Sequence, residues 1–326
     1  MPLLDIAQAR RLLMSRSELI ASGITDRELA ARLRAGSIRR VRRGWYVRSE
    51  DWNAQWGEGR HLIEVVAAHQ NSEPPGPLFV GVSAAVLHGL PIYRHVPIRP
   101  HALIEHRGHT SGRVGIHWHD LAFDDADITA IDGIRCSSLT RTVLDVASSL
   151  HLEGAVTTTD AALRRCAVID GRTQDEELAG VWRDDLLRRA DAVSTRGIRQ
   201  ARRVIEFADG RAESPGESVS RVQLDRIGFR QFDLQMPVVG PDGRTFWMDF
   251  AFRRSRCFGE FDGKSKYTDP EFARGRTSTE VLFDEKDRED SVRGVTGWRV
   301  GRWGAEHIKT PDALAARLRA FGITPP

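Results

Sequence analysis

The chain of 326 residues has only three cysteines and no long apolar run. Cys136, Cys166 and Cys257 are widely separated and odd in number, which argues against a disulfide framework and for a reducing compartment. A membrane-spanning helix needs ~18 or more consecutive apolar residues, and no stretch approaches that length. The opening MPLLDIAQARRLLM carries Asp5 and early arginines and does not resemble a signal peptide. We therefore expect a cytoplasmic protein with no membrane partner.

The net charge is small, but it is unevenly distributed. The chain has 48 basic and 45 acidic residues, which gives a formal net charge of +3. Its first fifty residues hold 11 arginines and 5 acidic residues, whereas the remainder holds 37 basic and 40 acidic residues. A local excess of arginine binds nucleic-acid phosphates by releasing counterions. The amino-terminal segment is therefore the candidate DNA-binding region.

The length also bounds the architecture. The chain exceeds ~150 residues, about the size of one ordinary core, and its 40% hydrophobic and 29% charged content is typical of a globular protein. No internal repeat or low-complexity tract is present. We predict an α+β multidomain protein with an N-terminal domain at residues 1–50, a mixed α/β middle region at 51–210 and a C-terminal domain at 211–326.

The most informative segment of the C-terminal domain is TFWMDFAFRRSRCFGEFDGK at residues 245–264. Alternation predicts a strand with Phe246, Met248, Phe250 and Phe252 on one face and Asp249 on the other. A second strand follows, on which Glu260 and Asp262 are two apart and share a side. If the two strands pair as a hairpin, Asp249 and Glu260 converge, and paired carboxylates at a strand edge suit Mg²⁺.

Further elements surround these two strands. A helix is predicted from Pro215, with Glu217 in its first turn and Gly228 just after its end. A strand at 232–239 leads through the turn signal Gly240-Pro241-Asp242-Gly243 into the first acidic strand. A second helix is predicted at 279–293 and a last strand at 298–303. The expected order is helix, three strands, helix and strand.

The segment from about Glu213 to Trp303, with its motifs ESPGES, WMDFAF, GEFDGKSKY, EVLFDEKDREDSVR and GWRVGRW, resembles a bacterial family related to very-short-patch-repair endonucleases, within the PD-(D/E)XK nuclease superfamily. The resemblance implies a restriction-endonuclease-like αβββαβ core that binds Mg²⁺, with Mn²⁺ as a substitute. It also implies that Asp249 and Glu260 are metal ligands and that Glu217 is an additional acid.

One position departs from the superfamily pattern. The usual lysine lies two residues after the second acid, and Asp262 occupies that place here. Lys264 or Lys266 is the candidate replacement that would neutralise charge on the phosphate. The candidate catalytic residues are therefore Glu217, Asp249, Glu260, Asp262, Lys264 and Lys266.

The first fifty residues contain a predicted helix followed by a basic hairpin. Thr25 and Glu28 have the spacing of a capping box, so a helix is expected to start there. Leu29 and Leu33 lie on one face of it. The run SIRRVRRGWYV at 37–47 then alternates apolar and basic residues about a glycine turn, which predicts a basic β-wing. The candidate DNA-contacting residues are Arg27, Arg32, Arg34, Arg39, Arg40, Arg42 and Arg43.

These residues, in SELIASGIT, DRELAARLRAG and SIRRVRRGWYV, resemble the winged helix-turn-helix domain at the front of AbiEi-family antitoxins. SAAVLHGLP at 83–91 and DGIRCSSLTRTVLDVA at 132–147 extend the resemblance into the middle region. The resemblance implies binding to double-stranded DNA, with the helix from Thr25 in a major groove and the wing against the backbone. It also implies a toxin partner encoded nearby.

Four histidines cluster in the middle region, at His106, His109, His117 and His119. Imidazole pairs bind Zn²⁺, but no cysteine lies nearby and the spacing matches no closed zinc module. The cluster is therefore interpreted as a polar strand face.

Two functions remain open from the sequence. The first is a DNA-binding protein whose C-terminal domain cleaves phosphodiester bonds with Mg²⁺. The alternative is a non-catalytic transcriptional regulator or type IV antitoxin with a degenerate nuclease fold, which Asp262 at the lysine position favours. The sequence leaves the DNA site and the oligomeric state open.

Overall fold

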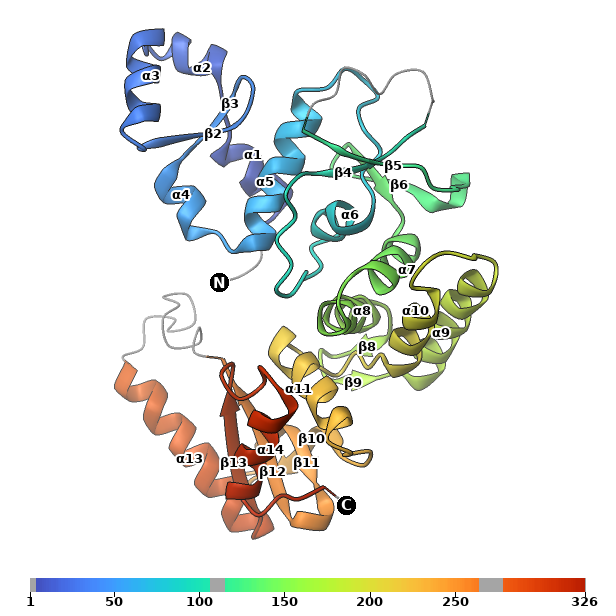
Figure 1. Ribbon diagram of the computed structural model, residues 1–326. Helices are drawn as coiled ribbons and strands as arrows, with labels where there is room; N and C mark the ends of the chain where they lie inside the picture. The colour runs from blue at the N-terminus through green and yellow to red at the C-terminus, as the bar shows by residue number, and fades with distance from the viewer. Residues whose placement is uncertain (1–3, 106–114, 264–277, 326) are drawn as a thin grey trace. The chain divides into compact units, whose positions relative to one another are not determined.

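The computed structural model describes residues 4–105, 115–263 and 278–325 and shows a mixed α+β protein with several small sheets (Figure 1). The chain divides into two compact units. The N-terminal unit comprises Pro2–Ala162 and Arg183–Glu206, and the C-terminal unit comprises Leu163–Trp182 and Phe207–Pro326. Helices α8 (Leu152–Ala167) and α9 (Glu176–Asp191) contribute residues to both units.

The N-terminal unit begins with short helices around a three-stranded antiparallel sheet of order β1-β3-β2. Its elements are α1 (Ile6–Leu12), β1 (Met14–Ser15), α2 (Arg16–Ala21), α3 (Asp26–Arg34), β2 (Ile38–Arg42) and β3 (Trp45–Arg48). Leu19, Leu29, Ile38 and Tyr46 form its core. The helix predicted from Thr25 is confirmed, and the Thr25 hydroxyl accepts a hydrogen bond from the Glu28 amide at 3.2 Å. The Glu28 carboxylate pairs with Arg32 at 2.6 Å instead of completing the capping box.

The rest of the N-terminal unit is mainly helical, with two small two-stranded sheets. Its elements are α4 (Ser49–Ala54), α5 (Gly57–Gln70), α6 (Gly81–Leu87), β4 (His101–Leu103), β5 (His117–His119), β6 (Ile128–Ile131), β7 (Ile134–Ser137), α7 (Leu139–Ser149), the first part of α8, the second part of α9 and α10 (Ile198–Phe207). The pair β4–β5 is parallel, and β6–β7 is an antiparallel hairpin. The apolar faces of α5, α6 and α7 are buried and form much of the core.

The C-terminal unit is built on a four-stranded sheet of order β10-β11-β12-β13. Its elements are the hairpin β8 (Val168–Ile169) and β9 (Thr173–Gln174), then α11 (Pro215–Arg226), β10 (Asp233–Val239), β11 (Thr245–Phe252), β12 (Cys257–Asp262), α13 (Ser278–Thr296), β13 (Arg299–Gly304) and α14 (Pro311–Ala320). The first three strands are antiparallel, and β12 pairs with β13 in parallel. From α11 to β13, the predicted order of elements is confirmed.

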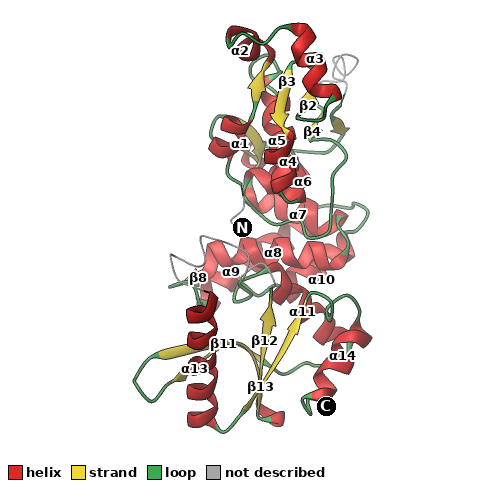
Figure 2. Ribbon diagram, turned by 90° about the vertical axis from the view of Figure 1, so that its left-hand side faces the viewer, coloured by secondary structure: helices red, strands yellow, loops and turns green. Residues whose placement is uncertain are grey.

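The helices cover the two faces of this sheet, with α13 on one side and α11 and α14 on the other (Figure 2). Val292 of α13 packs in a cluster with Met248, Ala251 and Phe258. On the α11 side, the buried indole of Trp303 packs against Phe250 and donates a hydrogen bond to the Ser220 hydroxyl at 2.8 Å. These contacts fix α11 against the strands that carry the acidic residues.

The face predicted for the aromatic residues of β11 is partly wrong. Phe246 and Met248 belong to the cluster on the α13 side, whereas Phe250 contacts Trp303 on the α11 side. Alternation therefore shifts by one residue between positions 248 and 250. The cause is a local distortion of the sheet, because Gln235, which lies opposite this point on β10, has a φ of 49°.

No helix among the described residues is both long enough and apolar enough to cross a membrane.

Candidate functional site

Glu217 is buried in the first turn of α11 and is held there by its own helix cap. Ser214 is the N-cap, and Pro215 occupies the first helical turn, where a proline fits. The Ser214 hydroxyl donates to one Glu217 carboxylate oxygen at 2.7 Å, and the Glu213 amide donates to the other at 2.9 Å. The Glu217 amide in turn donates to the Ser214 hydroxyl at 3.2 Å. The hydrogen bonds of the helix cap, from Ser214 and Glu213, therefore fix the position of the Glu217 carboxylate.

Asp249 is the second acid of the site, at the point where β11 and β12 cease to pair. The last paired residues are Phe250 and Gly259, and beyond them the Phe261 amide donates to the Asp249 carboxylate at 2.9 Å. Burial, followed by the negative charge of Asp249, raises the pKa of Glu217 to about 8. Glu217 and Asp249 therefore lie close enough to interact electrostatically.

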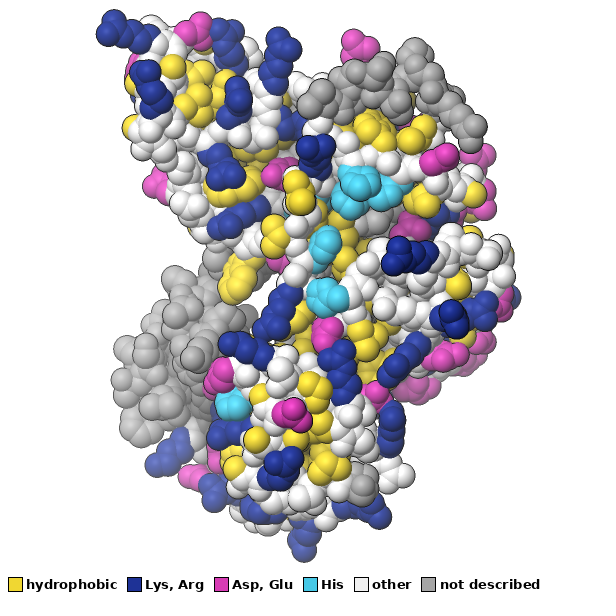
Figure 3. Space-filling model, in the orientation of Figure 1, with side chains coloured by type: hydrophobic (Ala, Val, Ile, Leu, Met, Phe, Trp, Pro, Cys, Tyr) yellow, Lys and Arg dark blue, Asp and Glu magenta, His cyan; other side chains and the backbone are white. Residues whose placement is uncertain are grey.

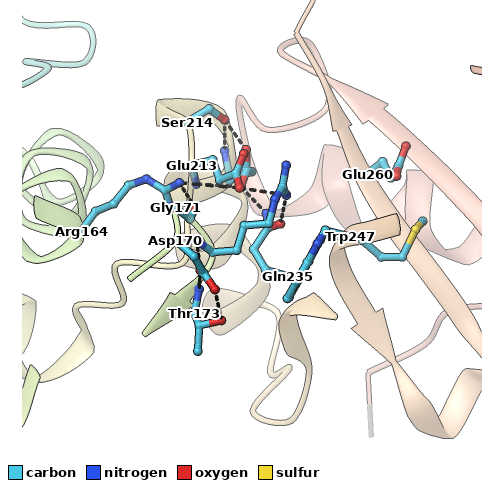
Figure 4. Close-up of polar contacts among 12 residues, drawn as sticks. Arg164, Asp170, Gly171, Thr173, Glu213, Ser214, Gln235, Trp247 and Glu260 are labelled. Carbon is cyan, nitrogen blue, oxygen red and sulfur yellow. Dashed lines mark hydrogen bonds and ion pairs between the residues drawn. The ribbon is translucent and has the colours of Figure 1, made fainter. Parts of the chain in front are cut away.

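Glu260 has different neighbours. It lies on β12 among Met248, Val292 and two arginines, on the face that α13 covers. Its carboxylate accepts from Arg288 at 2.7 Å and lies 3.4 Å from the Arg302 guanidinium. Glu217, in contrast, comes from the helix on the other face of the sheet, and Figure 4 shows Glu260 apart from the Glu213–Ser214 cluster.

The remaining predicted catalytic residues follow Glu260 in the sequence. Asp262 ends β12 beside Gly304 of β13 and is partly buried. Lys264 and Lys266 lie outside the described residues. Within the described residues, no group of three or more His, Cys, Asp or Glu side chains is arranged to hold a metal ion. The sequence predicts Asp249 and Glu260 as the metal ligands, but Glu260 is paired with Arg288 and Arg302, and the acid that interacts with Asp249 is Glu217.

Two residues that sequence reasoning missed lie next to Glu217: Gln235 of β10, which Figure 4 labels, and Arg172 of the β8–β9 hairpin. The Gln235 side chain is buried and donates to the Glu217 carboxylate at 3.4 Å. Arg172 donates to the Gln235 carbonyl oxygen at 3.0 Å and lies 3.0 Å from the Glu213 carboxylate. Its guanidinium also lies 5.7 Å from the ring centroid of Trp247. No sequence motif marks Arg172, which precedes α11 by more than forty residues.

The arginines predicted to bind DNA differ in their solvent exposure and in their contacts with other residues. Arg27, Arg34, Arg39, Arg40 and Arg43 are exposed. Arg32 is paired with Glu28 on the same helix. Arg42 is half-buried and donates to the Gly115 carbonyl at 3.1 Å. Basic side chains are spread over the region of the N-terminal unit that holds α2, α3 and the β2–β3 hairpin (Figure 3).

The histidine-rich strand also has a partner that sequence reasoning missed. His117 and His119 stack with ring centroids 4.6 Å apart, and His101 of β4 lies 4.9 Å from each of them. Burial and the neighbouring imidazoles lower the pKa of His101 to about 3, so its ring is neutral at pH 7. His106 and His109 lie outside the described residues.

No family model matches the chain. The chain is 30% identical over 196 residues to the uncharacterized protein MT2308 of Mycobacterium tuberculosis (strain CDC 1551 / Oshkosh) and to the uncharacterized protein Rv2248 of Mycobacterium tuberculosis (strain ATCC 25618 / H37Rv). In each case the match covers 59% of this chain and 64% of the relative.

Proposed function

We propose that the protein binds double-stranded DNA through its first fifty residues, which form a winged helix-turn-helix domain. The proposal is supported by the order of α2, α3 and the β2–β3 hairpin and by five exposed arginines on α3 and the hairpin. Exposed arginine side chains bind phosphate through charge and position a protein on the duplex. The helix α3 would lie in the major groove and the β2–β3 wing against the backbone.

We propose further that the C-terminal unit is a restriction-endonuclease-like domain that cleaves phosphodiester bonds with Mg²⁺. The observation that carries this proposal is the pairing of a buried Glu217 with Asp249 at the point where two central strands separate. Burial and the Asp249 charge favour a protonated Glu217, and a hard cation with oxygen ligands would replace that proton and relieve the repulsion between the two carboxylates. The donor atoms of the pair therefore fit Mg²⁺, with Mn²⁺ as a substitute.

Each residue has a defined role in this scheme. Glu217 and Asp249 would hold the cation, and the Phe261 amide keeps the Asp249 carboxylate oriented. A bound divalent cation offsets charge on the scissile phosphate and activates water. Lys264 or Lys266 would supply a positive charge to the phosphate. Glu260 is paired with Arg288 and Arg302 and would have to exchange these contacts to join the cation site.

A second candidate function is a non-catalytic regulator or type IV antitoxin. The pairing of Glu260 with two arginines favours it, because this acid is then part of the packing between β12 and α13. Asp262 at the position of the usual lysine supports the same non-catalytic function. In this case the C-terminal unit would bind DNA or a protein partner, such as a toxin encoded nearby, without turnover.

Nicking of supercoiled plasmid DNA distinguishes the two functions. The assay compares the wild type with Asp249→Asn and Glu260→Ala, in Mg²⁺ and in Mn²⁺, while a gel-shift assay follows DNA binding separately. Asp242→Asn is the matched control, because Asp242 is an acid of the same unit that pairs with Arg244 in the turn before β11.

Each outcome of the nicking assay has a defined meaning. Metal-dependent nicking that Asp249→Asn and Glu260→Ala abolish, and that Asp242→Asn retains, supports the nuclease. Nicking that survives Asp249→Asn rejects the site. DNA binding without nicking by the wild type in either metal rejects the nuclease and leaves the regulator.

A further inference from the structure

Gln235 has a backbone conformation that is unusual for its place in the fold. It lies within β10 with a φ of 49°, in the left-handed region that L-residues other than glycine, asparagine and aspartate rarely adopt. The flanking pairs Leu234–Phe250 and Met236–Met248 place it opposite Asp249. Strained residues of this kind persist only where the surrounding structure imposes them, and they cluster at functional sites.

The side chain of Gln235 shows what this conformation achieves. It is 3% exposed and directs its amide group to Glu217 and its carbonyl oxygen to Arg172. The contact with Glu217 is long, at 3.4 Å, so its geometry depends on how firmly the carboxamide is held. The Arg172 bond at 3.0 Å supplies that hold, because it fixes which end of the carboxamide faces Glu217.

Arg172 is itself held in place by several groups. Its guanidinium bridges Gln235 and the Glu213 carboxylate and lies over Trp247. Glu213 also lies 3.6 Å from Arg164, and its amide donates to Glu217. Glu213 and Gln235 both donate to the same oxygen of the Glu217 carboxylate, and Arg172 contacts both of these residues. A planar guanidinium with several donors suits this bridging, whereas a lysine acts as a point charge.

We propose that Arg172 and Gln235 are positioning residues that hold the Glu217 carboxylate toward Asp249, so that the two acids bind one divalent cation together. The proposal rests on the cation site of the proposed function. It adds two residues that support Glu217, and one of them, Arg172, comes from a hairpin outside the αβββαβ core. Neither residue touches the cation. Their effect is on its affinity.

Calorimetric titration of the full chain with Mn²⁺ tests this proposal. We expect Arg172→Gln to weaken Mn²⁺ binding at least tenfold, because the carboxamide of Gln235 is then free to rotate. Arg172→Lys is expected to restore part of the affinity. Arg253→Gln is the matched control, because Arg253 also pairs with an acid at the start of β10, Asp233, but lies at an exposed position outside the cluster. It is expected to change the affinity less than twofold.

A second variant separates positioning from folding. Gln235→Gly accommodates the positive φ without strain and removes the carboxamide. We expect it to fold, as judged by circular dichroism and the urea unfolding midpoint, and to lose Mn²⁺ affinity as Arg172→Gln does. Wild-type affinity in folded Gln235→Gly or in Arg172→Gln overturns the positioning role alone. A wild type that does not bind Mn²⁺ overturns both this role and the cation site.

Discussion

The change Glu260→Gln measures whether this acid belongs to a cation site or to the packing of the fold. In the structure, the Glu260 carboxylate is 2.7 Å from Arg288 and 3.4 Å from Arg302. Removing one partner of a fully buried ion pair costs about 3–5 kcal/mol, whereas an exposed pair contributes about 0.2–1 kcal/mol. The Glu260 side chain is 10% exposed, but those of Arg288 and Arg302 are 35% and 26% exposed.

The magnitude for Glu260→Gln therefore lies between those limits. Glutamine keeps the shape of the side chain and one acceptor oxygen for Arg288, so we expect a loss of about 1–2 kcal/mol in the free energy of unfolding. The control is Glu289→Gln. Among the described residues, Glu289 makes long contacts, at 3.4 Å to Arg302 and 3.5 Å to Arg293, and its loss should lower stability by less than about 0.5 kcal/mol.

Urea unfolding at pH 7, followed by tryptophan fluorescence without added metal, checks both values. Trp303 and Trp247 lie in the same unit and report on it. An acid held among other acids at an empty cation site destabilises the fold, so its neutralisation raises stability. A Glu260→Gln protein that is as stable as the wild type, or more stable, would refute the assignment of Glu260 to the ion-paired packing against α13.

Three other predictions follow from the structure. Burial raises the pKa of Asp145 to about 6 from 3.8, so its stabilising contribution is fully present below pH 4 and is lost as the pH rises through 6. Between pH 4 and pH 7.5, the free energy of unfolding of Asp145→Asn in urea should therefore rise by up to about 3 kcal/mol relative to that of the wild type. A pH-independent difference between the two proteins would contradict this. Gly216→Ala should lower the free energy of unfolding in urea by about 1–3 kcal/mol, because its Cβ would lie 2.0 Å from a ring atom of Phe261. Gly180→Ala, in an open helical position, should leave it unchanged. Changing Arg40 and Arg43 to Gln should reduce the slope of log binding constant against log salt by about 2 in fluorescence anisotropy with duplex DNA, and an unchanged slope would remove them from the interface.

Local signals in the sequence were sufficient to predict the order of elements in the C-terminal unit. Pro215 after Ser214 marks the start of α11, and Gly243 has the positive φ that its turn requires. These signals act within a few residues of each other, so periodicity and turn chemistry capture them. Glu217 is implicated only through the family resemblance, and element order alone does not predict which acids lie close together.

The face of the sheet to which each β11 side chain points could not be predicted in the same way. Strict alternation placed Met248 and Phe250 on one face, and the distortion opposite Gln235 separates them. A left-handed glutamine has no sequence signature, because its cause is the surrounding contacts with Arg172 and Glu217. Long-range side-chain contacts of this kind depend on the fold and cannot be read from spacing.

The acidic motif of the sequence therefore divides into two physically different parts. Glu260 is neutralised by cations of the chain itself, Arg288 and Arg302, and has no need of a metal for its stability. Glu217 has the opposite environment, because it is buried, interacts with Asp249 and, among the described residues, receives neutral hydrogen-bond donors from Glu213, Ser214 and Gln235. A divalent cation gains most where carboxylate charge is least compensated. We therefore expect metal binding at Glu217 and Asp249 first. For Glu260 to join them, its carboxylate would have to give up its ion pairs with Arg288 and Arg302. Whether Glu260 makes that exchange decides between the nuclease and the regulator.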